Sequence, residues 1–161
     1  MVKSAVVIVL AVAAPAVAEP PAQVQADLGL AVVGVGYEQP LGDHLAIMGE
    51  AQLFGTYFLP WFDRGSNVTG YGAQARGTWF HGEDHHGLYA MGFLRYDEVS
   101  DDSNASTLGF CGGLAAGYAF PATRKLDVRI GAGAQYMRYE GGTIDIDTPF
   151  IELDLVVGYR L

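Results

Sequence analysis

The amino-acid sequence predicts an all-β protein, a closed antiparallel up-and-down transmembrane β-barrel of eight strands. In the last segment, 151–161, apolar side chains such as Leu153 and Leu155 share one strand face, while Glu152 and Asp154 share the other. Glycine is abundant, with 22 of 161 residues, and no segment after the first eighteen residues is apolar for long enough to form a membrane helix. A span must then be made by a barrel whose strands face lipid on one side and a polar lumen on the other.

The first eighteen residues predict a secretory signal peptide, and residues 19–161 a single outer-membrane barrel domain. Lys3 gives a positive start, an apolar stretch follows, and Ala16-Val17-Ala18 is a small-residue cleavage site. Cleavage after Ala18 removes Lys3, which leaves 8 of the 9 basic residues against 18 acidic ones, a formal charge of −10. That balance argues against nucleic-acid binding. The single cysteine, Cys111, excludes an internal disulfide.

Seven segments show strand alternation, and an eighth strand is expected because bacterial barrels of one chain have an even number. In chain order the seven span 24–37, 44–57, 69–80, 87–96, 107–120, 126–139 and 151–161. The first is too apolar for its faces to be assigned, and the fourth alternates least regularly. The fifth sets large apolar residues against a face of small ones, and the others set apolar residues against Asp, Glu, Gln or Arg. The eighth strand is expected either before Tyr37 or within 142–147, where Ile144 and Ile146 alternate with aspartates.

The connections alternate between short and long, as the periplasmic turns and outer loops of such barrels do. The segments 39–43, 81–86 and 121–125 are short, whereas 59–68, 97–106 and 140–148 are longer and polar or acidic. Aromatic residues near the strand ends predict two girdles at the membrane interfaces. They are Tyr57, Phe58, Trp61, Phe62, Trp79, Phe80, Tyr96, Tyr118, Phe120 and Tyr139.

The polar strand faces predict a lumen in which four acidic residues balance four arginines. A barrel of eight strands has room inside only for side chains, so desolvated charges there need partners. Asp127 and Arg129 are expected to pair with Glu152 or Asp154 on the next strand. A salt-bridged plug is therefore favoured over a narrow pore. The predicted network comprises Glu50, Arg76, Arg95, Asp127, Arg129, Glu152, Asp154 and Arg160.

Together these features resemble the small bacterial outer-membrane barrels of the OmpA-like and OmpX-like kind. Four stretches, Gly34–Leu41, Gly87–Tyr89, Gly131–Tyr136 and Leu153–Tyr159, are similar to an uncharacterised small-barrel family of Gram-negative bacteria. The resemblance implies an outer-membrane location, contact with outer-membrane lipid and lipopolysaccharide, and insertion by the barrel-assembly machinery. That machinery reads a last strand that usually ends in an aromatic residue, whereas this chain ends in Leu161.

Candidates for chemistry are few. His81, His85 and His86 have metal-ligand side chains, but a hydrated polar turn explains them better, and no cofactor is expected. The acidic segment 97–104 lacks the spacing of a calcium loop. The serines after the signal peptide lie in predicted loops, and most histidines in a turn at the other end, so catalysis by a Ser–His–acid triad is not expected.

The favoured role is structural or a surface interaction through the acidic loops 97–106 and 140–148. Such loops would meet anionic lipopolysaccharide only through divalent cations. The alternative is a secreted, soluble, lipocalin-like barrel that carries an apolar ligand, and Gly77-Thr78-Trp79 matches the lipocalin G-x-W, although in mid-chain. A narrow pore is the lesser alternative. Balanced strand charges suit a closed polar lumen and favour the membrane barrel. No oligomeric state is predicted.

Overall fold

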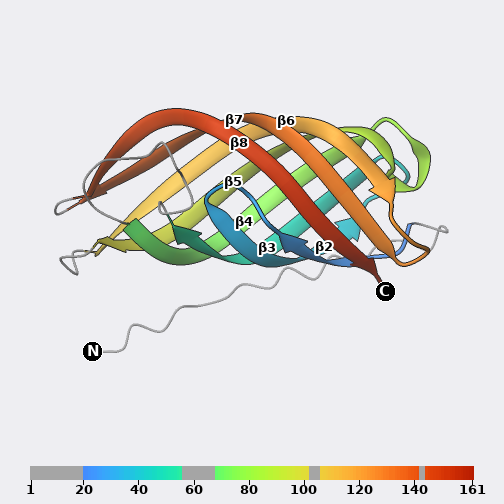
Figure 1. Ribbon diagram of the computed structural model, residues 1–161, viewed down its shortest axis with the longest axis horizontal. Coiled ribbons are helices and arrows are strands. Elements are labelled where there is room, and N and C mark those ends of the chain that lie inside the picture. Colours follow the sequence, from blue (N-terminus) through green and yellow to red (C-terminus); the bar gives the residue numbers. More distant parts are fainter. Residues whose placement is uncertain (1–19, 56–67, 102–105, 142–143) are drawn as a thin grey trace.

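The computed structural model describes residues 20–55, 68–101, 106–141 and 144–161 (Figure 1). Each strand is antiparallel to the next, and β1 also pairs with β8, so the sheet closes into an eight-stranded up-and-down barrel. The predicted fold class is confirmed. The strands are β1 (Gln23–Asp27), β2 (Val32–Pro40), β3 (Leu45–Gly55), β4 (Val68–Phe80), β5 (Gly87–Asp101), β6 (Ser106–Pro121), β7 (Leu126–Gly141) and β8 (Ile144–Arg160).

The eighth strand lies before Tyr37, one of the two expected places. The predicted segment 24–37 is a hairpin, in which β1 and β2 are joined by the turn 28–31. The backbone N–H of Leu28 donates to the carbonyl oxygen of Leu155 (2.8 Å), which fixes this turn against β8. The other expected place was wrong, because Ile144 opens β8 and no separate strand forms there.

The two ends of the barrel differ. One end, called the turn end here, carries Leu161 and three tight connections: 41–44, 81–86 with the short 3-10 helix η2 (Glu83–His85), and 122–125 (Figure 1). The opposite end is called the loop end. Strand length rises from 5 residues in β1 to 17 in β8. The pairing of β7 with β8 therefore continues toward the loop end well beyond the last pair of β1 with β8, Asp27 and Val156.

Much of the predicted loops 97–106 and 140–148 is strand, so those boundaries were wrong. β5 continues to Asp101, β7 to Gly141, and β8 begins at Ile144. Apart from the buried Asp97, polar residues that suggested loops, such as Asp145 and Asp147, are the outward members of an alternating pattern, and residues such as Val99 and Ile146 are the inward members. Residues 102–105 and 142–143 lie outside the described part of the chain.

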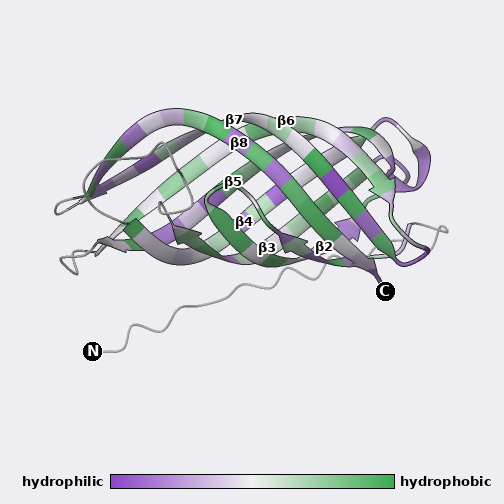
Figure 2. Ribbon diagram, in the orientation of Figure 1, coloured by the Kyte–Doolittle hydropathy of each residue, from purple (hydrophilic) through white to green (hydrophobic). Residues whose placement is uncertain are grey.

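The outer wall is apolar around its middle. Leu94 and Leu114 are 71% and 72% exposed, and hydrophobic residues recur along the strands between the polar turns and the loop end (Figure 2). Alternation explains this wall, since Leu153 points outward while Glu152 and Asp154 are buried. Within the described residues, no helix combines the length and hydrophobicity that crossing a membrane would require.

This polarity reverses at the loop end. There charged residues such as Glu140 and Asp147 join apolar ones such as Leu108 on the outside, while Ile144, Ile146 and Val99 are buried inside the barrel. A sheet that is polar outside and apolar inside is the arrangement of a strand surrounded by water. The strands of the loop end therefore extend beyond the apolar belt.

The predicted aromatic girdles are partly wrong. Phe80 and Tyr139 are fully buried inside the barrel, because they share the inward face with Thr78 and Gln135. The outward residues Trp79, Tyr96, Tyr118 and Phe120 remain on the wall. The other four, Tyr57, Phe58, Trp61 and Phe62, lie outside the described residues.

Candidate functional site: the charged lumen

Charged and amide side chains fill the middle of the barrel. Seven of the eight expected lumen residues are at least nine-tenths buried, and the side chain of Arg160 is 20% exposed near the turn end. The structure adds three buried acids that sequence reasoning missed: Asp27, Glu38 and Asp97. Acids therefore outnumber arginines among the described lumen residues, and the expected balance of four against four was wrong.

Arg76 is the centre of the first cluster. It pairs with Asp27 of β1, and its Nη1 lies 3.4 Å from Oδ1 of Asp154 on β8. Its Nη2 lies 3.9 Å from Oε2 of Glu50 on β3. The hydroxyl of Tyr89, on β5, donates to Asp154 from the other side. One guanidinium thus faces three carboxyl groups. The contacts with Asp27 and Asp154 join β4 to β1 and β8, which are not its neighbours, whereas Glu50 lies on the adjacent strand β3.

A second cluster surrounds Asp97, which is fully buried nearer the loop end. Asp97 accepts hydrogen bonds from Gln52 Nε2 and from the hydroxyl of Tyr139, both at 2.7 Å. Arg95 lies 3.3 Å from the same carboxylate and donates to Gln135 (3.1 Å). Asp97 therefore ties β3, β5 and β7 together through polar side chains.

The third cluster closes the turn end. Arg129 donates two hydrogen bonds to Glu38 (2.6 and 2.5 Å), and its guanidinium lies 4.8 Å from the centre of the Phe80 ring. Asp127 accepts from Arg160 (2.7 and 3.0 Å) and from Gln23 (2.7 Å). This geometry is bidentate at both carboxylates, the strong form of such pairs.

The expected pairs of Asp127 and Arg129 with Glu152 or Asp154 were wrong. The register of β7 with β8 places Asp127 opposite Gly158 and Arg129 opposite Val156. Arg129 instead reaches across the lumen to Glu38 of β2, whose inward direction was hidden in a segment with no assignable faces.

The three candidate metal ligands are not brought together. His85 is buried, stacks on Phe80 (4.6 Å between ring centres), and its Nε2 lies 2.8 Å from the carbonyl oxygen of Gly42. His86 Nε2 lies 3.0 Å from Asp127, whereas His81 is exposed beside Trp79. Among the described residues, no group of three or more His, Cys, Asp or Glu is placed to hold a metal ion.

Because His85 is buried in the turn 81–86, we expect the stability of the barrel to fall in acid. Burial lowers the pKa of His85, which lies outside the strands, below the usual value near 6.5. The unfolded chain then takes up this proton first as pH falls, so stability is present above about pH 6.5 and is lost below it. The slope is at most about 1.4 kcal/mol per pH unit for one proton. Denaturant unfolding at several pH values should show this loss, and His85→Gln should reduce it, whereas the exposed-site variant His81→Gln should keep the wild-type profile.

Removing one hydroxyl tests the Asp97 cluster. Tyr139→Phe leaves a buried carboxylate without one of its donors and is expected to lower the free energy of unfolding by about 1.5–3 kcal/mol, the range for hydrogen bonds to charged groups. Tyr71→Phe is the matched control, because the Tyr71 hydroxyl donates to Glu98 (2.8 Å) on the exposed wall. Equal losses in the two variants would contradict a special role for the buried bond.

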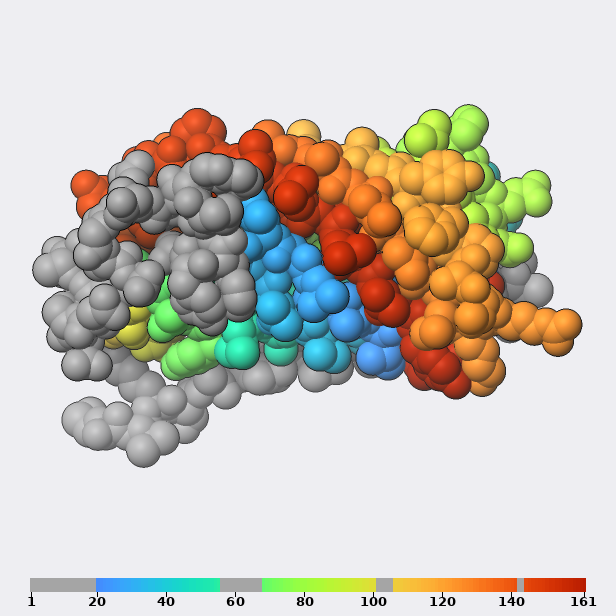
Figure 3. Space-filling model, viewed as in Figure 1, coloured from blue at the N-terminus to red at the C-terminus, as the bar shows by residue number. Residues whose placement is uncertain are grey.

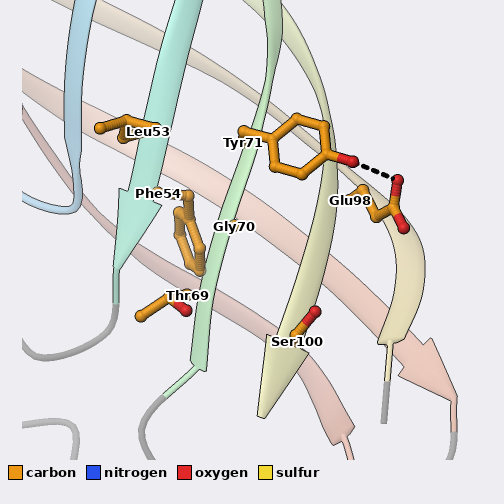
Figure 4. Close-up of a pocket in the computed structure, with 7 residues that line it drawn as sticks. All are labelled: Leu53, Phe54, Thr69, Gly70, Tyr71, Glu98 and Ser100. Carbon is orange, nitrogen blue, oxygen red and sulfur yellow. Dashed lines mark hydrogen bonds between the residues drawn. The ribbon is translucent and has the colours of Figure 1, made fainter. Parts of the chain in front are cut away.

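A shallow pocket of about 310 Å³ opens on the outer wall near the loop end (Figure 4). It lies over β3, β4 and β5, and the hydrogen bond from Tyr71 to Glu98 closes one side. Ser100 lines this pocket, while His81, His85 and His86 lie at the turn end, so these residues form no catalytic triad. The lining residues are Leu53, Phe54, Thr69, Gly70, Tyr71, Glu98 and Ser100.

A comparison with protein-family models finds no match, and neither does a search of curated protein sequences. Among solved structures, the chain is similar to the crystal structure of Neisserial surface protein A. The similarity has a TM-score of 0.57 and 13% sequence identity, and it covers 87% of this chain and 94% of that one. What the two share is the fold. The small-barrel architecture expected from the sequence is thus confirmed, while the narrower likeness to OmpA-like and OmpX-like barrels stays a prediction.

Proposed function

We propose that this chain is an outer-membrane protein of a Gram-negative bacterium, inserted after loss of the signal peptide 1–18, with a structural or surface-interaction role. The observation that carries the proposal is the reversal of polarity along the wall. Around the middle, apolar side chains face outward over a charged lumen, and at the loop end charged side chains face outward over an apolar interior. A barrel needs this change where it passes from lipid into water.

The same observation disfavours the soluble, lipocalin-like alternative. A carrier in water needs a polar wall and an apolar cavity. In this barrel the interior holds the charged residues Arg76, Asp27 and Asp154. The outer wall exposes large apolar residues such as Leu94 and Leu114. An apolar belt of this size on a soluble monomer would be an aggregation surface, whereas lipid removes it from water.

Side chains that bridge the lumen support a plug rather than a pore. Arg129 of β7 meets Glu38 of β2, and Arg76 of β4 meets Asp27 of β1. Phe54 and Tyr139 stack across the barrel at 5.2 Å between ring centres. Steady conductance of the folded protein in planar bilayers would contradict the plug.

The proposed orientation places the turn end in the periplasm and the loop end outside the cell, the usual direction for such barrels. The acids Glu98, Glu140 and Asp147, on the outer side of β5, β7 and β8, then lie at the level of lipopolysaccharide, which they would contact through divalent cations. Insertion by the barrel-assembly machinery belongs to the same proposal. A role in binding or in stabilising the membrane needs no catalytic residue, and we propose none.

Labelling of single cysteines tests location and orientation together. Cys111 is buried and should react little with a membrane-impermeant maleimide in wild type. In whole cells, Glu140→Cys at the loop end should be labelled, and Thr123→Cys at the turn end only after lysis. A soluble exported protein would release both sites with the periplasmic fraction, and an inverted barrel would reverse the pattern.

A further inference from the structure

We propose that Asp27 and Glu50 share one proton inside the barrel, and that this proton holds the tip of the β1–β2 hairpin against the wall. Asp27 is the last residue of β1, and Glu50 lies in the middle of β3. The two carboxyl groups meet across β2, the strand between them. The inference concerns the folded barrel itself and does not depend on the proposed location or role.

The first observation is that Glu50 has no hydrogen-bond donor. Its side chain is fully buried, and neither carboxylate oxygen accepts a hydrogen bond from any described residue. The closest positive atom recorded for it is Nη2 of Arg76, at 3.9 Å. A buried ionised carboxylate without donors is strongly unfavourable, and proteins avoid it by pairing or neutralising the group.

The second observation is the neighbour of Glu50. Both carboxyl groups face one atom, because Nη2 of Arg76 pairs with Oδ2 of Asp27 and lies 3.9 Å from Oε2 of Glu50, which brings the two acids into close contact. Two ionised carboxylates only accept hydrogen bonds, so this contact is repulsive unless one of them carries a proton. A single proton makes one carboxyl a donor and the other an acceptor, as in carboxylate pairs that cannot both ionise. It supplies the donor that Glu50 lacks.

The third observation is the space that lets the pair form. Gly34 of β2 lies opposite Asp27 in the register, and a side-chain carbon at position 34 would collide with Oε1 of Glu50. Glycine at this inward position therefore allows Glu50 to cross β2 toward β1. The pair exists because the chain has no side chain in the way.

The surrounding charges explain why a proton is retained. Arg76 is shared by Asp27, Asp154 and Glu50, so one positive charge faces three acids. Arg95 is engaged with Asp97. The charged groups that act on Glu50 are Asp27 of β1, Arg76 of β4 and Arg95 of β5. Tyr89 of β5 and Glu152 and Asp154 of β8 in turn act on Arg76.

Loss of the shared proton should weaken the attachment of the β1–β2 hairpin to the rest of the barrel. The folded barrel binds one proton that the unfolded chain has already released at neutral pH, so stability falls as pH rises. Deprotonation leaves two adjacent carboxylates at the tip of β1, a strand that pairs over only five residues. The β1–β2 hairpin should therefore exchange its amide hydrogens faster in alkaline solution than the other hairpins.

The test compares the full chain, folded in detergent micelles, with Glu50→Gln. The amide carries its own donor, so this variant should remove the alkaline fall in the denaturant midpoint that wild type shows. Glu140→Gln, on the exposed wall, should keep that fall. Infrared spectra at neutral pH should show a protonated carboxyl band in wild type that is absent from Glu50→Gln and present in Glu152→Gln.

Several results would overturn the proposal. Wild type without a protonated carboxyl band at neutral pH would do so, and this measurement needs no variant to fold. A Glu50→Gln profile that falls with pH as wild type does would also contradict it. If added Na⁺ or Ca²⁺ abolishes the alkaline fall, the pair binds a metal cation instead of a proton.

Discussion

Arg76→Met is expected to lower the free energy of unfolding of the barrel by about 3–5 kcal/mol, the range for removing one partner of a buried ion pair. Asp27, Glu50 and Asp154 all face this guanidinium, so its loss leaves buried acids without a positive partner. Urea unfolding in lipid vesicles, followed by tryptophan fluorescence, measures the change, and heat-modifiable migration in gels reports whether the barrel still folds.

Arg138→Met is the matched control for Arg76. The side chain of Arg138 pairs with Glu140 on the exposed wall, where both are about half exposed, and such pairs contribute little. Its loss should change the free energy of unfolding by no more than about 0.5 kcal/mol. If the two variants were equally stable, the lumen cluster would be filling space without holding the barrel together.

Leu114→Arg is the second large expected effect. Leu114 lies in the middle of β6 and is 72% exposed on the apolar wall. An arginine there should lower stability in vesicles by about 2–4 kcal/mol, the range for a cation at the bilayer midplane. Ala122→Arg, in the exposed turn that follows β6, should be nearly neutral in the same vesicles. An equally small effect at both positions would contradict the proposal that the wall faces lipid.

The faces of the strands were predictable because alternation is a local property. Leu153 and Glu152 differ in polarity and point to opposite sides whatever strand lies beside them. The hairpin within 24–37 could not be predicted. Its turn, Leu28-Gly29-Leu30-Ala31, contains a single glycine among apolar residues that are typical of a strand. The ends of β5 and β8 were missed for a different reason. Their outward acids resemble a loop when the inward Val99 and Ile146 are not recognised as an inner face.

The composition of the lumen was predictable in part, and its pairing was not. Asp97 was placed in a loop, and Asp27 and Glu38 lay in a segment without assigned faces. Which charges meet depends on the stagger of the closed barrel, and this brings Arg129 of β7 to Glu38 of β2. The stagger cannot be predicted from the sequence of any single strand. The glycine at position 34, which leaves space for Glu50, is the one local clue to a contact across a strand.

The barrel closes where the short strand β1 pairs with β8. β1 pairs with β2 and with β8 over five residues each, whereas β7 and β8 pair along sixteen positions from Leu126 to Gly141. In Figure 3 the red side chains of β8 lie beside the blue ones of β1 and β2 along this seam. The long neighbouring hairpins depend on contacts close in sequence and form readily, whereas the seam joins the two ends of the chain and closes the largest loop. We therefore expect the docking of Gln23–Asp27 against β8 to be the last step of folding, and the species before it to be an open sheet whose two free edges are β1 and β8.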